Sequence, residues 1–162
     1  ILLTISMVLV GFLVTIKGPI WIASFKINEN VKDLVDSINR CVFPICLLLI
    51  LFSPAIWFFT DDVLLLFYPK YATGAVYELT FIIYISLIAV VPIYLYDWAF
   101  VATSKEGTLF NLNLFGSLIA VLFYIIAWWM NADIVGFALM FLAARIIMLC
   151  TYFYRLRIMY VY

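Results

Sequence analysis

Five long apolar segments constrain this sequence more than any other feature. A hydrocarbon core of about 30 Å needs about 20 apolar residues in a helix. Five ranges meet this length, namely 1–25, 41–67, 79–103, 109–130 and 134–154. Strands of a membrane barrel would instead alternate apolar and polar residues over about ten positions. The sequence therefore predicts an all-α membrane protein, a single bundle of about five transmembrane helices.

Composition supports this class and excludes others. Hydrophobic residues make up 69% of the chain and charged residues only 11%, whereas soluble domains average roughly a quarter charged residues. Net charge is zero, so the composition lacks the excess of positive charge that is typical of proteins that bind nucleic acid. The chain has no histidine, and Cys41, Cys46 and Cys150 lack the spacing of metal ligands. We therefore expect no metal and no cofactor, with the cysteines packed as small apolar residues.

The connections between the segments differ in charge. The polar stretch 26–40 is long enough for a short helix at the membrane surface. Together with the third connection and the C-terminal tail, it holds six of the seven cations outside the spans: Lys26, Lys32, Arg40, Lys105, Arg155 and Arg157. The second and fourth connections hold only Lys70. Since Lys and Arg collect on the cytoplasmic side, the C-terminus is predicted to be cytoplasmic. The chain also opens apolar without Met, and we expect it to be a fragment of a longer protein.

Three ionisable residues fall inside the predicted spans: Lys17, Asp97 and Arg145. Each costs roughly 2.5–3.5 kcal/mol at the bilayer centre on insertion scales. At 1.5 Å per residue, all three lie about 9–13 Å from the predicted cytoplasmic helix ends. One interpretation is a structural pair of Asp97 with one cation, while the other cation reaches to the headgroups. The other is that both cations face a hydrated cavity and bind phosphate oxygens, with Asp97 tuning them.

Prolines lie close to two of these charges. Pro19 follows Lys17–Gly18, and Pro92 precedes Asp97 by five residues. Each proline inside a helix, Pro44 and Pro54 included, removes a backbone hydrogen bond, and in lipid a neighbouring helix or water must satisfy the freed carbonyl. Kinks beside buried charges are typical of transporters, although ordinary packing kinks remain an alternative.

Residues 64–107 resemble the C-terminal half of Wzx-type polysaccharide flippases, in the superfamily of multidrug, oligosaccharidyl-lipid and polysaccharide exporters. The loose family pattern LLFGxxYxxA…L, followed by an apolar helix ending in A…K, is matched by Leu66, Phe67, Tyr71, Ala75, Leu79, Ala102 and Lys105. Pro69 stands near the usual glycine, which is a departure at this outer turn. The segment 131–147 resembles the final helix of the family in its small residues, namely Gly136, Ala138, Ala143 and Ala144.

This resemblance implies a place in a twelve-helix transporter with both ends cytoplasmic. The chain would form most of the C-terminal six-helix lobe, and its missing N-terminal lobe would be a partner in the same chain. The implied function is to move an undecaprenyl-pyrophosphate-linked oligosaccharide from the cytoplasmic to the outer leaflet of the bacterial inner membrane. Lys17 and Arg145 would then bind the phosphates. Membrane lipids are the other expected partners.

Other classes remain open. A cation-coupled drug antiporter of the same superfamily would need membrane carboxylates for coupling, and Asp97 is the only deep one. A membrane-embedded enzyme of polysaccharide assembly would need an acid–base pair, and Asp61–Asp62 is the only adjacent acidic pair. A purely structural subunit would have little reason to keep three charges inside the membrane.

Overall fold

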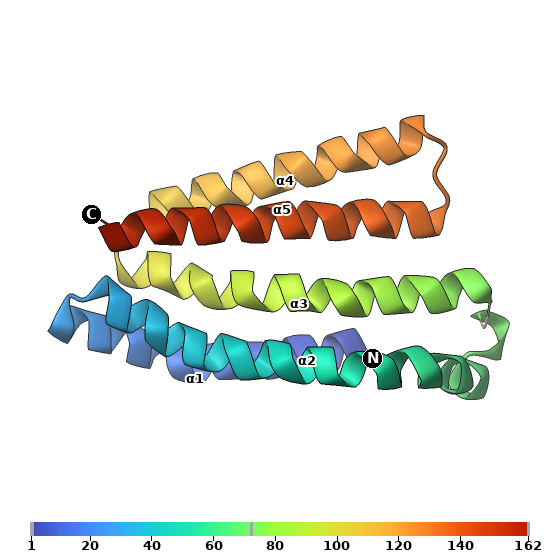
Figure 1. Cartoon of the computed structure of the whole chain (residues 1–162), viewed down its shortest axis with the longest axis horizontal. Helices are drawn as coiled ribbons and strands as arrows, with labels where there is room; N and C mark the ends of the chain where they lie inside the picture. Colours follow the sequence, from blue (N-terminus) through green and yellow to red (C-terminus); the bar gives the residue numbers. More distant parts are fainter. Residues whose placement is uncertain (1, 72, 162) are drawn as a thin grey trace.

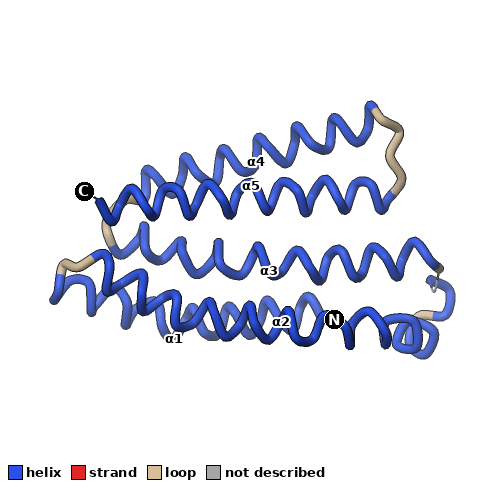
Figure 2. Tube along the Cα trace, viewed as in Figure 1, coloured by secondary structure: helices blue, strands red, loops and turns tan. Residues whose placement is uncertain are grey.

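The computed structural model describes the backbone of residues 2–71 and 73–161. Side chains are described throughout these ranges except at 2–7, 9, 10, 13, 14, 71, 160 and 161. The elements in chain order are α1 (Leu2–Asn28), α2 (Val31–Phe67), the short 3-10 helix η1 (Pro69–Tyr71), α3 (Gly74–Ala102), α4 (Glu106–Trp129) and α5 (Ile134–Val161). Figure 2 shows only helices and short connections over the described residues. The all-α prediction is therefore confirmed.

Each long helix runs antiparallel to the one before it in the chain, and α3 lies in the middle of the bundle (Figure 1). α1 and α2 pack against one side of α3, and α5 packs against the other and carries α4. Over the described residues four helices, α2 to α5, are long and apolar enough to cross a membrane. The predicted span 1–25 falls on α1, whose side chains are described only in part. The chain is a multi-pass membrane protein.

The polar stretch 26–40 does not form a separate surface helix, and that prediction is wrong. α1 continues to Asn28, and α2 begins at Val31 and runs without a break into the apolar segment. Between them the chain reverses at Glu29, which adopts a left-handed φ of 48°. Asn30 caps α2 by accepting hydrogen bonds from the backbone N–H groups of Lys32 and Asp33. This cap stabilises the first turn of α2. The helix can therefore begin within the polar stretch and continue into the apolar segment.

Two of the prolines inside helices have identifiable hydrogen-bond donors at the carbonyls they free. Pro92 removes the backbone donor for the carbonyl of Ile88, and the Cys46 thiol on α2 lies 3.8 Å from that oxygen as its donor. Pro54 does the same to the carbonyl of Ile50, which accepts a 2.8 Å bond from the Ser53 hydroxyl. Within the membrane such donors replace the missing backbone bond. Cys46 therefore makes a polar contact as well as an apolar one.

Candidate functional site

Contacts between helices place several polar residues at one level of the bundle. The hydroxyl of Tyr96 on α3 bonds to Asn39 on α2 at 2.7 Å, and Trp21 on α1 bonds to Ser37 on α2 at 3.2 Å. Gly18 packs so closely on Trp98 that a Cβ there would lie 2.7 Å from the indole ring.

The neighbours of these contacts define what we call the Asp97 level. Its members are Lys17, Arg40, Asp97 and the two residues that meet Asp97 from α4 and α5, Asn113 and Tyr152.

The acidic residues near the opposite end lie about one bilayer thickness from this level. On α2, Asp61 is 21 residues from Arg40, or about 31 Å of helix. On α3, Glu78 is 19 residues from Asp97, or about 28 Å. Asp133, whose carboxylate caps α5 by accepting a 2.8 Å bond from the Gly136 N–H, is also 19 residues from Tyr152. A hydrocarbon core of about 30 Å fits between the two levels on all three helices.

This spacing gives the three predicted site residues different depths from those expected from the sequence. A core of this thickness would end near Lys17 and Asp97, and α1, α2 and α5 continue past this level into a packed layer. Buried residues of that layer include Leu34, Ile38, Phe100, Leu156 and Met159. Arg145 lies seven residues before Tyr152 on α5, about 10 Å further into the membrane. The three charges therefore do not share one depth, and Arg145 is the deep one.

Asp97 is held by a phenol rather than by a cation. The Tyr152 hydroxyl donates to Oδ1 of Asp97 at 2.5 Å, which ties α5 to α3. The same hydroxyl oxygen lies 3.2 Å from Oδ1 of Asn113 on α4. One phenol proton serves one acceptor at a time, and a half-turn of the Asn113 carboxamide would present its N–H donor instead. Three helices thus meet at this hydroxyl.

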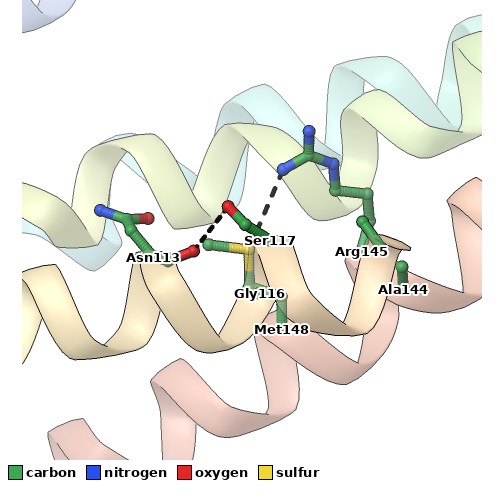
Figure 3. Close-up of a pocket in the computed structure, with 7 residues that line it drawn as sticks. Asn113, Gly116, Ser117, Ala144, Arg145 and Met148 are labelled. Carbon is green, nitrogen blue, oxygen red and sulfur yellow. Dashed lines mark hydrogen bonds between the residues drawn. The ribbon is translucent and has the colours of Figure 1, made fainter. Parts of the chain in front are cut away.

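Arg145 lines a pocket between α4 and α5 with a volume of about 150 Å³. The pocket is bounded by Asn113, Gly116, Ser117, Ala120, Ala144, Arg145 and Met148. Figure 3 shows the Arg145 guanidinium and the Ser117 hydroxyl on the same side of α4, with Asn113 one turn further along.

Arg145 is half-buried, and the described contacts of its guanidinium are weak ones. It stands 4.8 Å from the centroid of the Phe141 ring and 3.9 Å from the Met148 sulfur.

The structure links two of the predicted site residues and leaves the third apart. Asn113 lines the Arg145 pocket and also touches the Tyr152–Asp97 bond, so Arg145 and Asp97 are neighbours through one side chain. Lys17 is exposed on α1, across α3 from α5. Among the described residues it makes no hydrogen bond or ion pair.

Sequence reasoning missed Asn113, Ser117 and Tyr152 as members of this site. One signal was present in the spacing. Asn113 and Ser117 are four residues apart, and Arg145 and Tyr152 are seven apart, so each pair shares a helix face. The sequence alone does not indicate that these two helix faces meet.

Comparisons with protein-family models, curated proteins and solved structures found no match for this chain. Over the described residues, groups of three or more carboxylate and thiol side chains that would suit a metal ion do not occur. The pocket itself offers one cation, one carboxamide and one hydroxyl, from Arg145, Asn113 and Ser117.

Proposed function

We propose that the protein moves an undecaprenyl-pyrophosphate-linked oligosaccharide across the bacterial inner membrane, with Arg145 binding the phosphate groups during passage. A charged headgroup with sugars cannot cross hydrocarbon unaided and needs a polar, cation-bearing surface at membrane depth. Arginine suits phosphate because its planar guanidinium can donate two parallel hydrogen bonds.

The observation that carries this proposal is the lack of a carboxylate at Arg145. Among the described residues no acidic side chain pairs with it, and Asp97 is already bonded to Tyr152. A deep arginine costs a few kcal/mol to insert, and its contacts with Phe141 and Met148 offset only part of that cost. An anionic ligand would supply the missing counter-charge.

The neighbours of Arg145 have complementary roles in this proposal. Ser117 and Asn113 offer a hydroxyl and a carboxamide as further hydrogen-bond donors to phosphate oxygens. Asp97 acts indirectly: it fixes Tyr152, and Tyr152 positions Asn113 at the edge of the pocket. A carboxylate pointing into the pocket would repel the ligand, and its bond to Tyr152 avoids that.

In this proposal the bundle is part of one lobe of a two-lobed transporter, and the Arg145 pocket faces the passage between the lobes. The Asp97 level and the C-terminus lie on the cytoplasmic side, where the cations of the connections gather. The headgroup would enter at this level and move inward by about 10 Å to reach Arg145.

Complementation tests the proposal. The complete protein, expressed in a bacterial strain lacking its own polysaccharide flippase, should restore surface polysaccharide, and Arg145→Gln should abolish the restoration at equal membrane abundance. Arg155→Gln, on an exposed residue of the same helix beyond the boundary, serves as the matched control.

Reconstituted proteoliposomes distinguish the two transporter classes. Translocation of lipid-linked sugar supports the proposal. Dye efflux driven by a cation gradient, without lipid translocation, would replace it with the antiporter.

A further inference from the structure

A pair of exposed cations, Lys17 on α1 and Arg40 on α2, lies on the outer surface of the bundle at the Asp97 level. From its position we propose that this pair binds the phosphate of an anionic phospholipid of the surrounding bilayer. This inference does not depend on the transport function. It rests on the relative position of the two residues, on their depth and on what surrounds them.

The two side chains lie at the same height on neighbouring antiparallel helices. Trp21 and Ser37 form the hydrogen bond that joins α1 to α2. Lys17 is four residues before Trp21, and Arg40 is three residues after Ser37, so each lies about one turn from the same bond. Because the helices are antiparallel, both displacements run in the same direction, toward the membrane interior.

They also project to the same side. At about 100° per residue, Lys17 and Arg40 turn away from the Trp21–Ser37 contact toward one face of the helix pair. The opposite face carries Gly18 and Ile38, which are buried in the bundle, Gly18 against Trp98 of α3. The two cations therefore share the outward face, away from α3 and far from the Arg145 pocket.

The exposed surface of α2 changes character at Arg40. Deeper in the membrane the helix exposes large apolar side chains, among them Phe43, Leu47 and Leu48. Further out it exposes Asp36 and Asp33, which lie one and two turns beyond Arg40. The cations thus stand at the boundary between lipid chains and water, where phosphate groups lie, and the carboxylates lie outside it.

Charge complementarity identifies the occupant. Among the described residues neither cation has an ion-pair or hydrogen-bond partner. Two cations from adjacent helices can share one phosphate, whereas a zwitterionic choline or ethanolamine headgroup brings a cation of its own. An anionic phospholipid is therefore favoured over a zwitterionic one.

Retention of lipid by the protein tests the proposal. The protein is placed in nanodiscs of mixed phosphatidylglycerol and phosphatidylcholine, and native mass spectrometry counts the lipids that stay bound. The double variant Lys17→Gln/Arg40→Gln should lose preference for phosphatidylglycerol by about fivefold per cation, since a cation near the surface contributes about 1 kcal/mol.

Two control variants make the outcome decisive. Lys17→Arg/Arg40→Lys keeps both charges and should keep the preference, while Lys70→Gln removes a cation at the other end of the bundle and should also keep it. An unchanged preference in the double Gln variant would overturn the proposal. So would an equal loss in the charge-preserving variant, because that would show a packing effect instead of a phosphate site.

Discussion

The Tyr152 hydroxyl donates a 2.5 Å hydrogen bond to Asp97, and the same oxygen lies 3.2 Å from the carboxamide of Asn113. This single group joins α3, α4 and α5. It also holds the Asp97 carboxylate apart from the Arg145 guanidinium. Among the described residues, the arrangement leaves Arg145 without a counter-charge in its pocket, and the proposed function rests on this.

Replacing Tyr152 by Phe should destabilise the bundle without changing its apolar packing. The variant leaves the half-buried carboxylate of Asp97 without a donor, which costs about 1–3 kcal/mol. Unfolding in mixed detergent micelles, followed by circular dichroism, measures the loss. Tyr154→Phe is the matched control, because Tyr154 is on the same helix and 65% exposed. Equal stability of the two variants would contradict the structural role of the bond.

Gly18 should tolerate no side chain, because α1 approaches α3 too closely there. A Cβ would lie 2.7 Å from three atoms of the Trp98 ring, and overpacking of this kind costs about 1–3 kcal/mol. The same unfolding assay should show Gly18→Ala clearly destabilised and Gly11→Ala nearly unchanged, since nothing lies within 4 Å of a Cβ at Gly11. Equal stability of the two variants would show that α1 does not pack against α3 as described.

Gly116→Ala offers a contrasting case at the pocket. Its Cβ would meet the Met148 sulfur at 2.6 Å, but a methionine side chain is flexible and can move. We expect less destabilisation than at Gly18, and a loss of ligand binding as Met148 is pushed into the pocket beside Arg145. Large destabilisation with binding intact would reverse this expectation.

The Cys46 thiol should matter only while Pro92 is present. Cys46→Ala removes the donor to the Ile88 carbonyl and should cost about 0.5–1.5 kcal/mol, whereas Cys46→Ser keeps a donor. In a Pro92→Ala background the backbone N–H returns, and Cys46→Ala should then cost little. A double-mutant cycle on the free energy of unfolding measures this coupling. Additive effects would show that the thiol is only a packing group.

Single cysteines along α2 should report both membrane boundaries. In a background without native cysteines, a water-soluble maleimide should label positions 36 and 62 and leave positions 48 and 52 unlabelled. All four native residues are exposed on the helix, so differences in labelling reflect lipid rather than burial. Labelling at position 48 would move the membrane boundary away from the Asp97 level and change the depth assigned to Arg145.

The apolar lengths in the sequence were enough to predict α2 to α5, the helices that the described residues show to be long and apolar enough to cross a membrane, because a helix must satisfy its own backbone in lipid. They were not enough to predict depth. The sequence gives depth only from the ends of the apolar segments, whereas α1, α2 and α5 continue into a packed layer with residues such as Ile38 and Leu156 in its core. A hydrocarbon core of about 30 Å would then end near Lys17 and Asp97.

The partners of Asp97 could not be predicted from a single sequence either. Tyr152 and Asn113 are 55 and 16 residues away along the chain, and their meeting depends on the register between three helices. That register is set by contacts such as Gly18 against Trp98 and Tyr96 with Asn39, and the apolar pattern carries no signal for them. Arg145 itself could be found, since a charge in the middle of an apolar segment stands out.

The most direct measurement of the central claim is the affinity of the protein in nanodiscs for a polyprenyl-pyrophosphate lipid, compared between the unchanged chain, Arg145→Lys and Arg145→Gln. A charge-assisted hydrogen bond contributes about 1.5–3 kcal/mol, so Arg145→Gln should weaken binding by about 10- to 150-fold and Arg145→Lys by less. Equal affinity in all three proteins would show that Arg145 does not bind the phosphates, and would contradict the account.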